Sequence, residues 1–223
     1  MIDDILTQYY EDCKLEPCEF GHLYITATEY PPEELRLWRP VGYDNDVAKS
    51  WANTFGITNP PNDAFRRKYP LSNPRLKINE EFIVTRSKPR PVLLLFAPRA
   101  IDEPQPKGMG RIWRPLCLVA PIFSLEFPNT GYEKFSSGFV ERVRKLDFPQ
   151  LMFLPKYKDA LTVDSLARLD ECQSVSINSL RPLGVSLSGP VKSLLRSQLL
   201  CLMGDLYEGD YHVYRELIKE GFA

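Results

Sequence analysis

Histidine is scarce in this chain of 223 residues, which contains only two. A membrane-spanning helix needs about 20 apolar residues, and no apolar run in the chain approaches that length. The opening residues, MIDDILTQYY, are acidic and lack the basic flank and apolar stretch of a secretory signal. The five cysteines are odd in number and widely scattered, which is typical of free thiols in a reducing compartment. We therefore expect a soluble, cytoplasmic protein.

Familiar catalytic signatures are also missing. The chain has no Gly-rich phosphate loop, no Ser-His-Asp order and no convincing pair of catalytic carboxylates, and nothing in it predicts a nucleotide cofactor. Cys13, Cys18 and His22 have the spacing C-x4-C-x3-H, so three zinc ligands with His212 as a fourth are one interpretation. Because a second paired knuckle is absent, packing thiols are favoured, and we expect neither metal nor cofactor.

Charge is unevenly distributed along the chain, although the net charge is only -1. Residues 1–59 carry 4 basic and 11 acidic side chains, whereas residues 60–115 carry 12 basic and 5 acidic ones. This basic band is suited to attracting phosphate groups, or to docking on the acidic N-terminal piece of the same chain. Its candidate RNA-binding or partner-binding residues are Arg66, Arg67, Lys68, Arg86, Lys88 and Arg111.

The first third of the chain has a mixed pattern. Residues 1–20 favour a helix, 22–30 alternate like a strand, and 31–38 and 44–56 favour two further helices. The turn-rich stretch 57–74 then predicts a domain boundary. We therefore expect an acidic mixed α/β N-terminal extension over residues 1–74 and a second domain over 75–223.

The second domain is predicted to be rich in short strands. Candidate strands are 80–85, 91–97, 116–126, 150–155 and 164–175, with no crossover helices between them. This order favours a small, strongly bent barrel or a half-open sheet over a doubly wound parallel sheet. Residues 189–204 and 205–221 then predict two C-terminal helices, the first with Leu194, Leu195, Leu199 and Leu202 on one apolar face.

The segment KPRPVLLLFAPRA, residues 88–100, places Arg90 between two prolines and directly before a run of five apolar residues. Prolines lack the amide that a sheet interior needs, so Pro89 and Pro91 predict a strand entrance or an edge. Arg90 should therefore lie at the mouth of a buried strand, either solvated in a turn or positioned to contact a ligand.

Three blocks resemble the PemK/MazF family of toxin-antitoxin toxins in order and spacing, from about Leu76 to Gly204. They are the Arg-Pro before an aliphatic strand (PRPVLLLF), the strand LCLVAPIFSLE, and the stretch from LARLDECQSV through PLGVSL to the closing helix. The resemblance implies an SH3-like barrel with C-terminal helices, commonly dimeric. In active members this barrel cleaves single-stranded RNA without a metal.

By the same resemblance, Arg90 occupies the position of the catalytic arginine, whose planar and permanently charged fork matches phosphate geometry. Active relatives carry a threonine where this chain has Phe123, and Ser124 follows one residue later. Strand alternation points Ser124 to the opposite face unless a bulge re-aims it. Asp170, Glu171 and Gln173 also depart from the family pattern.

The altered pattern predicts a repurposed toxin-fold module of a bacterial stress or phage-defence pathway. It would bind a protein partner or RNA, with weak or no catalysis. The alternative is a metal-independent, single-strand-specific endoribonuclease that uses Arg90 with Ser124 or another residue. A DNA-binding autoregulator is disfavoured because no helix-turn-helix signature is found.

Overall fold

The computed structural model describes residues 1–14, 18–30, 35–42, 51–57, 80–98, 115–127, 133–204 and 209–221, with the backbone alone for 40–42 and 51–57. Within it the chain forms two compact units. The larger comprises Met1–Thr28 and Pro89–Ala223, and the smaller comprises Glu29–Lys88. The predicted boundary between residues 74 and 75 lies outside the described residues and stays a prediction.

The larger unit is mixed α+β. Its elements in chain order are α1 (Ile2–Ile5), β1 (Tyr10–Asp12), β2 (His22–Glu29), β6 (Ser87–Phe96), β7 (Leu116–Ser124), α3 (Ser137–Arg144), β8 (Leu151–Leu154), β9 (Ser165–Arg168), β10 (Gln173–Ser176), the 3-10 helix η3 (Ile177–Ser179), β11 (Arg181–Leu187), α4 (Gly189–Leu202) and α5 (Asp210–Lys219). The outermost residues of β2 and β6 continue into the smaller unit.

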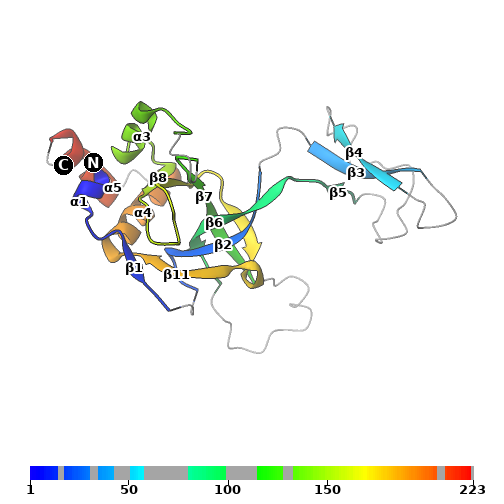
Figure 1. Cartoon of the computed structure of the whole chain (residues 1–223), viewed down its shortest axis with the longest axis horizontal. Helices are drawn as coiled ribbons and strands as arrows, with labels where there is room; N and C mark the ends of the chain where they lie inside the picture. Colours follow the sequence, from blue (N-terminus) through cyan, green and yellow to red (C-terminus); the bar gives the residue numbers. More distant parts are fainter. Residues whose placement is uncertain are drawn as a thin grey trace. The chain divides into compact units, whose positions relative to one another are not determined.

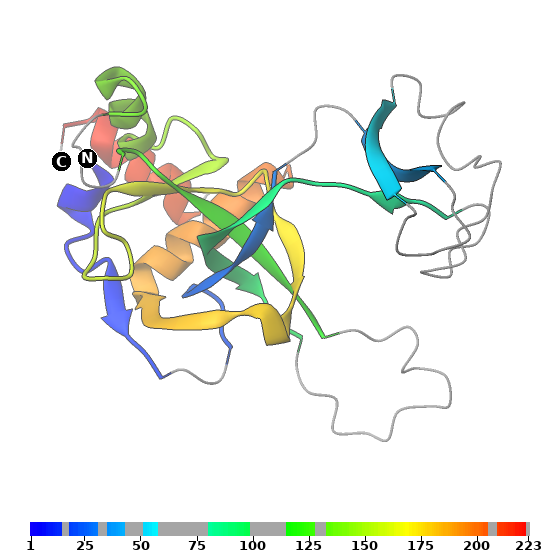
Figure 2. The ribbon, with the colours of Figure 1, turned by 45° about the vertical axis from the view of Figure 1, so that its right-hand side comes forward.

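One large sheet organises these elements. Its strands follow the order β1-β11-β2-β6-β7-β9-β8, and β10 pairs with β7 beside β9. The helices α1, α3 and α5 gather at one end of the unit in both ribbon views (Figure 1, Figure 2). The sheet runs from β1 to β8 without closing on itself, so the half-open form is observed and a closed barrel is not.

The central strand β6 explains the apolar run of the sequence. Val92, Leu93 and Leu94 are fully buried, and Leu95 is nearly so. Because successive side chains of a strand point to opposite faces, these residues divide between two cores. Leu93 and Leu95 join the main core. Val92 and Leu94 join a smaller core, whose buried members are Tyr24, Val92, Leu94, Cys117 and Val119.

The first residues of the chain are part of this larger unit. Among the described residues of 1–20, only Ile2–Ile5 are helical, so the helix predicted there is wrong for most of its length. Strand β1 instead pairs with β11, with Tyr10 opposite Leu187. The hydroxyl of Tyr9 donates to the carbonyl of Phe153 at 3.0 Å, and that of Tyr10 to the carbonyl of Pro155 at 2.8 Å. These hydrogen bonds between residues far apart in the sequence, together with the strand pairing, outweigh the local helical preference.

The smaller unit is a three-stranded sheet of order β4-β3-β5, formed by β3 (Leu35–Gly42), β4 (Trp51–Ile57) and β5 (Phe82–Ile83). The predicted helices over 31–38 and 44–56 are therefore wrong where the structure describes them. Leu37 is fully buried, and the Arg39 guanidinium donates two hydrogen bonds to Glu81, at 3.0 and 2.8 Å. Pairing across the sheet thus overrides the capping signals that favoured helices.

Most strands predicted for the later part of the chain are confirmed. Strands β7 and β8 lie within the expected ranges, as does β2 in the first third of the chain. Strand β6 begins four residues before the expected 91–97, and β5 covers only two residues of 80–85. The range 164–175 divides into β9 and β10, which pair with consecutive stretches of β7. A tight turn separates them, and there the amide of Leu169 donates to the carbonyl of Gln150.

The two C-terminal helices are confirmed, and the first packs on the main core through Val191, Leu194 and Leu195. Its apolar face matches the prediction only over the first turns, because Leu199 is half-buried and Leu202 is exposed. Gln198, by contrast, is fully buried and donates to the carbonyls of Pro149 and Leu151. In the described parts of the chain, no helix is long and apolar enough to cross a membrane.

We predict that Leu194→Ala lowers the free energy of unfolding by about 2 to 5 kcal/mol, because it opens a cavity under α4. Leu200 belongs to the same helix but is 39% exposed, so Leu200→Ala should change stability by less than about 0.5 kcal/mol. Urea denaturation of both variants measures the difference. Equal effects would show that α4 does not close the core through Leu194.

Candidate functional site

Arg90 lies on β6, two residues before the buried part of the strand. The ladder to β7 begins at Val92, which pairs with Pro121, so Pro89 and Pro91 precede that ladder. Arg90 thus lies just before the buried part of the strand, as expected, but the strand itself begins three residues earlier, at Ser87. Arg90 itself is half-buried, which limits the number of conformations that its long side chain can adopt.

The Arg90 side chain stacks on Phe123 of β7. The guanidinium carbon lies 4.3 Å from the centre of the phenylalanine ring, within the range of a cation–π interaction. Phe123 is half-buried and packs against the main core. We call this contact the Arg90–Phe123 stack. Phe123 thus forms the surface on which the guanidinium of Arg90 rests.

Ser124 is engaged elsewhere. Its hydroxyl accepts a hydrogen bond from the Lys134 ammonium at 2.6 Å. The β7–β9 ladder runs without a shift through Phe123 opposite Leu166 and Ser124 opposite Ser165. No bulge therefore re-aims the chain, and regular alternation directs Phe123 and Ser124 to opposite faces.

The acidic pair of the third resembling block is held by a residue that sequence reasoning missed. Arg168, the last residue of β9, donates to both carboxylate oxygens of Asp170 at 2.8 and 2.7 Å and lies 3.0 Å from Glu171. The hydrogen bond from Arg168 lowers the pKa of Asp170. The sequence R-x-D-E carries the signal for this contact, because it places the arginine two and three residues before the acids.

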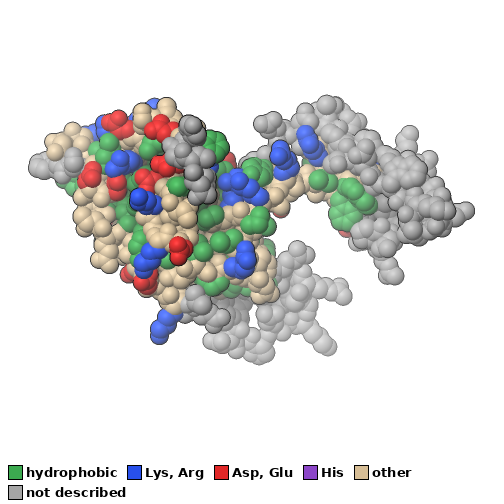
Figure 3. Space-filling model, viewed as in Figure 1, with side chains coloured by type: hydrophobic (Ala, Val, Ile, Leu, Met, Phe, Trp, Pro, Cys, Tyr) green, Lys and Arg blue, Asp and Glu red, His purple; other side chains and the backbone are tan. Residues whose placement is uncertain are grey.

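The predicted basic residues are only partly described. Arg86 and Lys88 are exposed residues of the smaller unit, and the Arg86 guanidinium lies 5.9 Å from the Tyr30 ring. Arg66, Arg67, Lys68 and Arg111 lie outside the described residues. On the visible face of the larger unit, basic and acidic side chains are interspersed (Figure 3), so this face carries no patch of a single charge.

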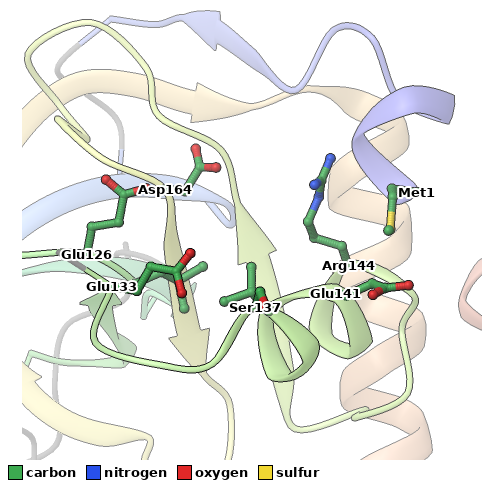
Figure 4. Close-up of a pocket in the computed structure, with 9 residues that line it drawn as sticks. Met1, Glu126, Glu133, Ser137, Glu141, Arg144 and Asp164 are labelled. Atoms are coloured by element: carbon green, nitrogen blue, oxygen red, sulfur yellow. The ribbon is translucent and has the colours of Figure 1, made fainter. Parts of the chain in front are cut away.

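A cavity of about 320 Å³ lies beside the end of β7. The α3 residues Ser137, Val140, Glu141 and Arg144 line one side of it. Acidic side chains extend from the other side (Figure 4), namely Glu126, Glu133 and Asp164. Its one arginine, Arg144, already donates two hydrogen bonds to Asp3, at 2.9 and 2.6 Å. A cavity with this lining disfavours phosphate groups.

The residues considered for zinc do not converge on a site. His22 is buried and lies 3.9 Å from Glu19, and burial lowers the pKa of its imidazole. The five cysteines are free thiols. Among the residues that the structure describes, no group of three or more His, Cys, Asp and Glu side chains is arranged to hold a metal ion.

Comparisons with protein-family models, with curated proteins and with solved structures found no match for this chain.

We predict that Arg168→Gln raises the pKa of Asp170, because the hydrogen bond that favours its ionised form is lost. The stability that this contact supplies is present above the unfolded-state pKa of Asp170 and is lost as the pH falls through the lower folded-state value. The variant should therefore be less stable than the natural chain at neutral pH, with the difference shrinking in strong acid.

An NMR titration of Asp170, and denaturation of the variant and the natural chain at neutral pH and in strong acid, test this expectation. Arg142→Gln is the matched control, because Arg142 pairs with Asp147 and should leave the Asp170 titration unchanged. An unaltered Asp170 pKa in Arg168→Gln would contradict the assignment.

Proposed function

We propose that this chain is a PemK/MazF-like toxin-fold module that binds a protein partner through the surface around the Arg90–Phe123 stack, with weak or no ribonuclease activity. Its place would be a bacterial stress or phage-defence pathway, and the half-open sheet would be a divergent form of the SH3-like barrel. The observation that carries the proposal is the stacking of the Phe123 ring against Arg90 at 4.3 Å.

The order of elements supports the family assignment. The Arg-Pro precedes the buried part of β6, the Pro-Ile precedes Phe123 on β7, and α4 follows β11. Three blocks that the sequence analysis singled out separately thus fall on neighbouring strands and on the helix that packs against them. The resemblance itself lies in the order and spacing of the three sequence blocks, and it extends over a little more than half of the chain.

The chemistry around Arg90 argues against efficient catalysis. RNA cleavage through the 2'-hydroxyl needs a group that moves its proton, a contribution of about 100-fold or more. Phe123 can neither give nor accept a proton. Ser124 is directed to the opposite face, where Lys134 donates to its hydroxyl. Neither Phe123 nor Ser124 therefore supplies the proton-transferring group that would have to act beside the charge-stabilising Arg90.

The same arrangement is suited to recognition of a protein. Arginine and aromatic residues are enriched among the interface residues that contribute most of the binding free energy. A ring that holds the guanidinium in place also reduces the side-chain entropy lost on binding. The mixed charge of the visible surface also favours a protein over a polyanion (Figure 3).

A metal-independent endoribonuclease is the second candidate, and the position of Arg90 favours it. The side chain is permanently charged and half-buried just before the buried part of β6, as a phosphate-binding arginine would be. This function would require a proton-transferring group other than Phe123.

An RNA-cleavage assay separates the two candidates. We expect the full chain to leave a mixed single-stranded RNA pool almost intact in the presence of a chelator, and Phe123→Thr to raise cleavage by restoring a hydroxyl beside Arg90. Efficient cleavage by the natural sequence that Arg90→Ala abolishes would establish the ribonuclease. Arg181→Ala, which removes an exposed arginine of β11, is the control for a general loss of charge.

Partner binding gives a second prediction. A protein that co-purifies with the full chain from its native host should be lost from both Arg90→Ala and Phe123→Ala and retained by Arg181→Ala. Retention by both site variants would place the interface elsewhere. RNA in place of protein, released steeply with rising salt, would instead favour RNA binding.

A further inference from the structure

Two cysteines far apart in the sequence both belong to the smaller core of the larger unit or pack against it. Cys117, on β7, is one of its buried members and is 1% exposed. Cys18, which precedes β2, is half-buried and packs against the same cluster. The core also contains Tyr24, which is 2% exposed.

The backbone explains how both cysteines reach this core. The amide of Gly21, three residues after Cys18, donates to the carbonyl of Leu94 on β6 at 2.8 Å. Leu94 in turn pairs with Val119 on β7, two residues beyond Cys117. The segment that carries Cys18 is therefore fixed to the strand next to the one that carries Cys117.

The electrostatic surroundings agree with this proximity and keep the Cys117 thiol protonated. Burial raises the pKa of Cys117, and the neighbouring Cys18 raises it further. The pKa of Tyr24 is also raised, first by burial and then by Cys18, Cys13 and Cys117. Because the thiolate is the reactive form, the raised pKa makes Cys117 slow to react directly with an oxidant, whereas Cys18 is the more accessible of the two.

We propose that Cys18 and Cys117 form a reversible disulfide when the protein meets a peroxide. The half-buried Cys18 thiol reacts first and gives a sulfenic acid and one water molecule. The Cys117 sulfur then attacks the Cys18 sulfur, the S–S bond forms, and the sulfenic oxygen leaves as a second water molecule. The peroxide is reduced to water and the two thiols are oxidised. An added dithiol reverses the step by exchange.

The bond would link the segment before β2 to β7, across about 100 residues of chain. Closing so long a loop restricts the unfolded chain, so the oxidised form should melt at a higher temperature. Strand β7 also carries Phe123, so oxidation acts on the strand that holds the Arg90–Phe123 stack. The inference does not depend on the proposed function, because the new bond itself is the readout.

The experiment treats the full chain with hydrogen peroxide and maps the disulfides by mass spectrometry without reduction. We expect the Cys18–Cys117 peptide pair as the main product, with a rise in melting temperature that dithiothreitol reverses. Cys18→Ser should abolish both changes. Cys172→Ser removes a thiol of the main core and is the matched control that retains them.

Because Cys117 is buried, both Cys117→Ser and Cys117→Ala are used, and their melting temperatures before oxidation report whether the fold is kept. A folded Cys117 variant that still shows the oxidation-dependent rise would overturn the proposal. A main product that joins Cys13 to Cys18, or oxidation that stops at sulfinic acid, would overturn it as well.

Discussion

The division of four consecutive aliphatic side chains between two cores is the constraint on which the larger unit depends. Val92 to Leu95 lie on β6, between β2 and β7, and strand alternation sends neighbouring residues to opposite faces. A slip by one residue would exchange the contents of both cores, so the register of β6 is strongly fixed. The same fixed register determines where Arg90 stands, because it precedes Val92 by only two residues.

The parts of the fold that the sequence revealed are those in which burial follows a simple period. The run before Phe96, the strands β7 and β8 and the helix α4 could be recognised because their apolar residues face a core. The two predicted helices of the smaller unit failed for a different reason. Capping signals near residues 31 and 44 are local, whereas the partners of Leu37 and Arg39 lie on distant strands. A single sequence carries no direct sign of such pairing.

Prediction of the candidate site from the sequence had the same limit. Alternation predicted that Phe123 and Ser124 would face opposite ways, and the unshifted β7–β9 ladder agrees. It could not show that the phenylalanine ring would support the arginine, or that Lys134 would donate to Ser124, because both contacts join segments whose spacing depends on the folded sheet. The arginine and the ring therefore act as one feature, although they belong to different strands.

The hydrogen bond between Tyr9 and Phe153 has a consequence for synthesis of the chain, since its partners are 144 residues apart. Strand β1 also pairs with β11, and β2 has β11 as its neighbour on one side. Until the ribosome has released β11, the nascent chain carries strands whose backbone amides and carbonyls have no partner in this sheet. Such unpaired edges attract other chains, so we expect this unit to fold slowly and to benefit from chaperones.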